Sequence, residues 1–450
     1  MANHLSNKPN FLIVTADELS CFATPWHPGC RARTPNMERL LRLGLAFDRA
    51  YCASPVCSAS RAAFWTGMLP SRNGIYENSQ AEDPAGTRDY PKSRPTLGSL
   101  LREHGYNAIH WGKKHDAGTL RGFEHIPTVA REPEYDCPWL PGGVAAKTDG
   151  FVAQGIAEFL ENPGDEPFAA VADIDNPHDI CVWMKKMTGM NELPTLPEGS
   201  PPLPELPDNF ETMDVETRGN PVKKHWQEHV ACKLVGDWTL EKWRHYLWAY
   251  DRYVELFDAK LGVILDAWLQ SPVRDRAWLW FWSDHGEGMA QHREITKGTL
   301  FYESTTRVPL LVAGPGVKPA RESALVSLID VAPTICELAG IPAPQTMQGR
   351  SLTTFLEGAT PDAWRDRIIC EWREHEHNRQ TGRMLRSERY KYIHYLRGGE
   401  ELYDLEQDPG EQHNLAADSR FKTTLQLYRR LLRQHTEESG DDYFNLIVKE

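Results

Sequence analysis

The sequence has no long apolar stretch. No window of about 18 consecutive apolar residues occurs in its 450 residues, so we expect no membrane-spanning helix. The start of the chain, MANHLSNKPNFLIV, lacks a positively charged segment followed by a long apolar core, the pattern typical of an export signal. The expected location of the sequence as it stands is the cytoplasm, or the periplasm or cell exterior if a signal peptide has been removed.

The chain also lacks an excess of positive charge and a cysteine framework. It has 50 Lys and Arg against 63 Asp and Glu, a net charge of −13, which disfavours a nucleic-acid partner. Its nine cysteines are odd in number and scattered, which argues against a disulfide scaffold. The 40% hydrophobic and 25% charged residues are typical of an ordinary globular protein.

Four short apolar segments share one design. Each has the pattern of a buried strand that ends in a cluster of ionisable residues: NFLIVTADE, YNAIHWGKKH, FAAVADIDNPH and AWLWFWSDHGE. Helical patterns lie between them, such as TPNMERLLRLGL and RPTLGSLLREHG. This alternation predicts an α/β fold with a large mixed, mostly parallel sheet sandwiched by helices. Because ligands bind beyond the carboxyl ends of such strands, the four clusters should converge on one edge.

We expect two domains. Residues 1–359 would form the large α/β domain, interrupted by a proline-rich surface insert at 191–221. Residues 360–450 would form a smaller C-terminal α+β domain that contains an antiparallel sheet, because RMLRSERYKYIHYLRGGEELYDL has the pattern of a hairpin. A closing helix is expected from about Phe421 to His435.

The ionisable clusters at two strand ends indicate a metal site. Asp17 and Glu18 end the first segment, and Asp284 and His285 end the fourth. Carboxylates with few cations beside them are costly to bring together unless a hard cation binds between them. Helix capping is an alternative for Asp17 and Glu18, but it does not account for both clusters. We therefore predict that these residues bind a divalent metal.

The other segments supply cations. Lys113 and His115 end the second segment, His178 ends the third, and Lys297 lies downstream of the fourth, while Arg61 lies in SPVCSASRAAFWTG. Each alone is more often a structural residue than a catalytic one. Together, around a metal, they predict a site for a tetrahedral oxyanion, because preorganised cations stabilise its developing charge.

Cys57 begins a predicted helix in that same stretch. Backbone N–H groups and the helix dipole there would lower the pKa of the thiol, so a thiolate nucleophile is one interpretation. A thiolate adduct of sulfate or phosphate, however, has no obvious way to release its product. A nucleophile of another kind at this position would serve better.

The motifs resemble those of the formylglycine-dependent sulfatases in the alkaline-phosphatase superfamily. That family's signature is Cys or Ser, any residue, Pro, Ser, Arg, and later Thr-Gly; here it reads Cys57-Ser58-Ala59-Ser60-Arg61 and then Thr66-Gly67. The resemblance continues in order through TADE, GKKH, NPH, SDHGE, the Lys297 segment and ELYDLEQDPGEQHNL, which together span nearly the whole chain.

The resemblance implies a sulfatase that hydrolyses a sulfate ester or sulfamate. Cys57 would be oxidised after translation to formylglycine, whose hydrated aldehyde attacks sulfur and later expels sulfate. One Ca²⁺ would be bound by residue 57 together with Asp17, Glu18, Asp284 and His285. Histidine softens that site, so Mn²⁺ and Zn²⁺ are alternatives.

The resemblance also implies roles for the cations. Arg61 would orient and stabilise residue 57, and Lys113 and Lys297 would hold the sulfate oxygens. His115 would act as a base on the second hydroxyl, and His178 would bind sulfate and help to protonate the leaving oxygen.

Three residues depart from the commoner pattern. Ala59 replaces the signature proline, which favours an anaerobic radical maturase as partner and hence a bacterial host. Glu18 replaces a second aspartate, and His285 replaces an asparagine. Both can still bind a metal.

The expected substrate is a small sulfated molecule, and a sulfated carbohydrate is favoured. The resemblance implies a pocket shaped by the variable insert and the C-terminal domain, where an exposed tryptophan would suit stacking on a sugar. The candidate contacts are Trp139, Trp183, His375, His377 and Arg379. The alternatives are a phosphonate monoester or phosphodiester hydrolase of the same superfamily, a choline-sulfatase-like enzyme, and a non-catalytic binding protein with Cys57 unmodified.

Overall fold

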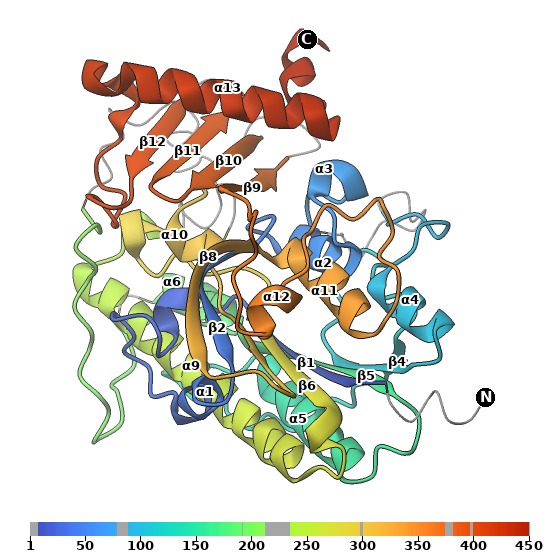
Figure 1. Cartoon of the computed structure of the whole chain (residues 1–450). Coiled ribbons are helices and arrows are strands. Elements are labelled where there is room, and N and C mark those ends of the chain that lie inside the picture. Colours follow the sequence, from blue (N-terminus) through green and yellow to red (C-terminus); the bar gives the residue numbers. More distant parts are fainter. Residues whose placement is uncertain are drawn as a thin grey trace.

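The structure is a computed structural model, which describes residues 8–78, 89–190, 192–211, 235–297, 300–373, 381–396 and 399–449. It contains a large eight-stranded sheet between helices and a smaller four-stranded sheet (Figure 1). The smaller sheet and helix α13 (Lys422–Ser439) lie at one end of the molecule, at the top of Figure 1. Within the described residues, no helix has both the length and the apolar character needed to cross a membrane.

The large sheet is mixed and mostly parallel, as predicted. Its strand order is β4-β3-β5-β1-β6-β7-β2-β8, and β7 alone runs against the other strands. The strands are β1 (Asn10–Asp17), β2 (Leu45–Tyr51), β3 (Asn107–Gly112), β4 (Glu124–Ile126), β5 (Phe168–Pro177), β6 (Ala277–Ser283), β7 (Leu310–Ala313) and β8 (Ala320–Ser327).

Helices cover both faces of this sheet (Figure 1). On β1, Leu12 and Val14 belong to one hydrophobic cluster and Phe11 and Ile13 to another, because successive side chains of a strand point to opposite faces. The first cluster includes residues of α1 (Pro35–Leu41), α5 (Ala145–Glu161), α6 (Ile180–Thr188) and α9 (Leu240–Gln270). The second includes residues of α2 (Cys57–Thr66), α4 (Leu97–Glu103), α11 (Val331–Leu338) and α12 (Thr353–Leu356).

The four predicted strands lie side by side. They are β3, β5, β1 and β6, and all four run in the same direction, so their polar ends meet at one edge of the sheet. Gly112 ends β3 with φ +102°, and a Cβ there would lie 1.9 Å from the Asp173 carbonyl oxygen. Only glycine therefore fits where the chain leaves β3 toward Lys113.

The small sheet is antiparallel. Its strand order is β12-β11-β10-β9, and the strands are β9 (Arg367–Trp372), β10 (Gly382–Ser387), β11 (Tyr390–Tyr395) and β12 (Glu400–Asp404). Helix α13 packs Leu425, Tyr428 and Leu432 against this sheet, and it ends at Ser439, beyond the predicted His435. The predicted boundary between residues 359 and 360 lies between the two sheets, and the division into two domains stays a prediction.

A buried ion cluster joins the small sheet to helix α10 (Glu303–Thr306), which precedes β7. Lys391 on β11 is fully buried, and its Nζ lies 2.8 Å from Glu303 Oε1 and 2.7 Å from Glu411 Oε1. Burial alone would raise the pKa of Glu303, but Lys391 and two arginines outweigh burial and hold that pKa at about 2. Glu303 begins this short helix, six residues after Lys297 in sequence.

The proline-rich insert is irregular where it is described. Residues 192–211 contain no helix or strand, in agreement with the prediction. Arg244 and Trp248 of α9 hold the insert by donating hydrogen bonds to the carbonyl oxygens of Pro204 and Pro201. The described part of the insert therefore packs along α9.

Candidate active site

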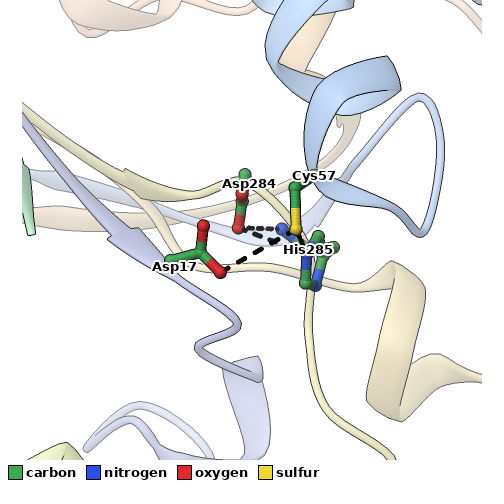
Figure 2. Close-up of side chains that lie close together, drawn as sticks. All are labelled: Asp17, Cys57, Asp284 and His285. Atoms are coloured by element: carbon green, nitrogen blue, oxygen red, sulfur yellow. Dashed lines mark hydrogen bonds and ion pairs between the residues drawn. The ribbon is translucent and has the colours of Figure 1, made fainter. Parts of the chain in front are cut away.

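Cys57 is the first residue of α2 and is buried. Its Sγ lies 3.1 Å from His285 Nε2 and 4.0 Å from Asp17 Oδ1 (Figure 2). Burial and Asp17 would raise the pKa of the thiol, but Lys297, His285 and a hydrogen bond with His115 outweigh them and lower it well below its usual value. The surroundings of residue 57 therefore favour an anion.

Cys57 and three other buried residues form a candidate metal site. One ligand atom from each of Asp17, Cys57, Asp284 and His285 lies within 4.8 Å of the others. Asp17 ends β1, and Asp284 and His285 follow the neighbouring β6, so the pairing of these strands brings the side chains together (Figure 2). The His285 Nδ1–H donates to the Gly286 carbonyl at 2.9 Å, which leaves Nε2 facing the cluster. This set of oxygen and nitrogen donors fits a divalent metal.

Glu18 lies beside this group and faces a different cluster. Its backbone has φ +70°, and one carboxylate oxygen lies within 4.8 Å of ligand atoms from His178 and Cys181. Oε2 lies 2.6 Å from Lys297 Nζ, whereas Oε1 is buried with no hydrogen-bond partner among the described residues. Such an orphaned oxygen would suit a cation, and the predicted role of Glu18 as a metal ligand stays a prediction.

Arg61 connects three buried carboxylates. It lies one helical turn after Cys57 and is fully buried. Its Nη2, Nη1 and Nε lie 3.0, 2.9 and 2.9 Å from Asp17, Asp173 and Asp284, respectively. The planar guanidinium thus holds the two candidate metal ligands Asp17 and Asp284 in fixed positions.

Asp173 was not predicted from the sequence. It lies on β5 and accepts hydrogen bonds from Arg61, from the Thr15 hydroxyl and from His110 Nε2, the last at 2.8 Å. The one sequence signal was the spacing of Asp173 and Asp175, which places two carboxylates on one side of an otherwise apolar strand. Asp173 therefore holds the Arg61 guanidinium in position through the hydrogen bond with Nη1.

The other predicted cations surround the same point. Lys113 Nζ lies 2.8 Å from Asp17 Oδ2, and His178 Nε2 lies 4.0 Å from Asp17 Oδ1 and 3.7 Å from Glu18 Oε2. Burial lowers the pKa of His178 well below its usual value, with help from Lys297 and Lys113. Lys113, His178 and the neighbouring His115 also line a cavity of about 600 Å³.

The predicted substrate contacts fare differently. Trp183 is only 2% exposed, packs against Trp238 and Tyr246, and donates its Nε1–H to the Trp139 carbonyl at 3.2 Å. Trp139 is partly buried against the same core, and neither ring lines the cavity. This corrects the predicted role of Trp183, because a ring so deeply packed cannot contact a substrate. The remaining three candidates lie outside the described residues: His375, His377 and Arg379.

Comparison with protein families agrees with this geometry. Residues 9–341 match the family model described as Sulfatase. The chain belongs to the sulfatase family. Residues 291–438 of this sulfatase also match the family model described as N-sulphoglucosamine sulphohydrolase, C-terminal.

Individual relatives cover almost the whole sulfatase. It is 37% identical to a Δ4,5-hexuronate-2-O-sulfatase of Bacteroides thetaiotaomicron, over 99% of this chain and 92% of the relative. It is 28% identical to a choline-sulfatase of Rhizobium meliloti, over 97% of this chain and 88% of the relative. A solved structure of a 2-O GAG sulfatase superposes with a TM-score of 0.90 at 36% identity, covering 97% of this chain and 93% of that chain.

These findings confirm the predicted family, fold class and enzyme class. The sulfatase is a hydrolase, and its family implies a metal ion and a formylglycine residue in general terms. The candidate metal site agrees with the first of these without identifying the ion.

Proposed function

We propose that this sulfatase removes the 2-O-sulfate of a hexuronate in a sulfated glycan. Support for the substrate comes from the hexuronate-2-O-sulfatase relative and from the solved 2-O GAG sulfatase structure, both named for action at a 2-O position. Support for the chemistry comes from one observation above all: the Sγ atom of buried Cys57 lies within 4.8 Å of a possible metal-ligand atom from each of Asp17, Asp284 and His285. We further propose that Cys57 is converted to formylglycine and that the metal is one Ca²⁺.

The protein's own side chains divide the remaining work. Formylglycine would supply a regenerable hydroxyl nucleophile, and the metal would polarise the sulfate oxygens. Lys113 and Lys297 approach the cluster from different segments and would hold the sulfate oxygens. His115, which hydrogen-bonds to residue 57, would accept a proton from it. His178 lines the cavity, and the negative charge of a bound sulfate would raise its lowered pKa, so that the ring could donate a proton to the departing sugar oxygen.

The test is the formylglycine content together with sulfate release. The protein is produced with an anaerobic radical maturase, the Cys57 peptide is measured by mass spectrometry, and a 2-O-sulfated hexuronide is compared with choline sulfate and a phosphonate monoester. We expect sulfate release that scales with formylglycine content and is lost in Cys57→Ala. Full activity with an unmodified thiol, or turnover of the phosphonate alone, would overturn the proposal.

The proposed maturase can be tested at Ala59. This residue is the third of α2, and proline is tolerated in the first turn of a helix because its N–H has no partner within the helix. Ala59→Pro should therefore fold normally and raise formylglycine content when the maturase present demands proline. With the radical maturase, both proteins should be modified. Equal modification of both proteins by the proline-demanding maturase would contradict this partner assignment.

A further inference from the structure

A cavity of about 600 Å³ lies beside Asp17 of the cluster. Its lining includes Lys113, His115 and His178. The chain after β4 and the start of α5 also contribute, with Thr128 and Thr148. This volume falls in the range of small-ligand pockets, so a sugar ring can lie in the cavity.

Lys113 and Asp175, which both line the cavity, form an ion pair. Lys113 Nζ lies 2.8 Å from Asp17 and 3.4 Å from Asp175. Asp175 is the carboxylate among the residues that line the cavity, it is only 6% exposed, and it also accepts a hydrogen bond from the Thr148 hydroxyl at 3.4 Å. The negative charge of Asp175 is therefore already compensated by Lys113.

Lys114 is the uncompensated charge of this cavity. It is exposed, it lines the cavity, and within the described part of the chain no carboxylate lies at ion-pair distance from its ammonium. The neighbouring His125 adds no charge near neutral pH, because burial and the nearby His110 and Lys114 lower its pKa to about 4. In a chain of net charge −13, Lys114 is thus an exposed cation in the lining of this cavity, without a carboxylate partner among the described residues.

We propose that Lys114 forms a second anion subsite, which binds the carboxylate of the sugar while the sulfate lies near Lys113 and Lys297. This inference rests on the proposed function. In a hexuronate the 2-O-sulfate and the C5 carboxylate stand on ring atoms opposite each other, so the two anions need cations at separate places. Lys113 and Lys114 provide two such cations in one cavity, of which one is committed to carboxylates of the protein and the other is not.

The experiment uses matched substrates and variants. The substrates are a 2-O-sulfated hexuronide, the same saccharide with its carboxyl group reduced to a hydroxymethyl group, and the reduced saccharide carrying a second sulfate on the adjoining sugar. The variants are Lys114→Met, Lys114→Arg and, as a control, Lys318→Met. Lys318 is an exposed lysine before β8, at the opposite edge of the sheet. All proteins are compared at equal formylglycine content.

We expect Lys114→Met to raise KM for the hexuronide about ten-fold with little change in kcat, as the loss of one charge-assisted contact predicts. KM for the reduced saccharide should not change, and Lys114→Arg should retain most of the affinity. Lys318→Met should behave as the wild type.

Other outcomes separate the two proposals. If the wild type discriminates against the reduced saccharide and Lys114→Met discriminates equally, the Lys114 subsite is wrong while the proposed function stands. If KM rises only for the saccharide with a second sulfate, the subsite binds sulfate and the assignment to a carboxylate is overturned. If the wild type hydrolyses a simple aryl sulfate but neither 2-O-sulfated saccharide, the proposed function fails.

Discussion

Replacement of Arg61 by lysine separates the charge of this side chain from its shape. Each of the three guanidinium nitrogens donates a hydrogen bond to a different buried carboxylate, at 2.9 to 3.0 Å. The single ammonium of lysine retains the positive charge, but it cannot occupy three separated positions at once. We therefore expect Arg61→Lys to keep about one of the three hydrogen bonds.

The magnitude follows from the two hydrogen bonds that lysine cannot make. A hydrogen bond to a charged group contributes about 1.5 to 3 kcal/mol, so the absence of two should lower the free energy of unfolding by about 3 to 6 kcal/mol. Asp17 and Asp284 would also no longer be held at a fixed spacing beside Cys57. Removal of such a supporting group typically costs about 10- to 100-fold in metal affinity or activity, and we expect a fall in kcat/KM of that size.

Arg383→Lys is the matched control. Arg383 is fully buried on β10, and its Nε and Nη2 lie 2.8 and 3.0 Å from the Asp441 carboxylate. Its replacement should lower the denaturant midpoint but leave kcat/KM for an aryl sulfate unchanged. An Arg61→Lys protein as stable as the wild type would refute the reasoning from three hydrogen bonds. An equal fall of kcat/KM in Arg383→Lys would show that the Arg61 effect is not specific to the site.

Three further predictions concern the same network and the buried ions. Asp173→Asn should lower kcat/KM by about 10- to 100-fold because it releases Arg61; a similar fall in Asp149→Asn, a buried aspartate whose carboxylate accepts hydrogen bonds from two backbone N–H groups, would contradict this. Chelation should lower the unfolding temperature and stop sulfate release, with Ca²⁺ restoring both, since a metal that binds only the folded state stabilises it; an unchanged unfolding temperature would refute a bound metal. The pKa of Glu303 is about 2 against its usual 4.5, so its stabilising effect is present above about pH 4.5 and is lost as the pH falls toward 2. Glu303→Gln should therefore show a flatter stability profile between about pH 5 and pH 3, measured by urea unfolding, and a slope equal to the wild type would count against it.

The convergence of the site could be predicted from the sequence. Each of the four apolar segments ends in charged residues, and parallel strands bring their carboxyl ends to one edge, so Asp17, Asp284 and His285 were placed correctly beside one another. Asp173 could not be found in this way. Its partners Arg61 and His110 are 112 and 63 residues away in sequence, and their approach depends on the position of α2 and on the register of β3 against β5.

Two other features depend on local geometry that the residue types do not reveal. Glu18 adopts φ +70°, a conformation that glutamate rarely takes, so its turn toward His178 could not be foreseen. Trp183 is a candidate substrate contact by residue type alone, because an exposed tryptophan suits stacking on a sugar. Its burial depends on packing against Trp238 and Tyr246, which come from a distant helix and the chain before it.

The buried ion pair between Lys391 and Glu303 limits how sulfatases of this kind can be recombined. A chimera joined near residue 360 would take its small sheet from another parent, and with it the residue at the position of Lys391. Without a cation there, the buried negative charge of Glu303 would lose its Lys391 partner. Breaking such a buried pair lowers the free energy of unfolding by about 3 to 5 kcal/mol. Glu303 lies six residues after Lys297, so a displaced Glu303 would also displace this predicted sulfate-binding lysine. A chimera without a cation at position 391 should therefore lose catalytic activity before its small sheet unfolds.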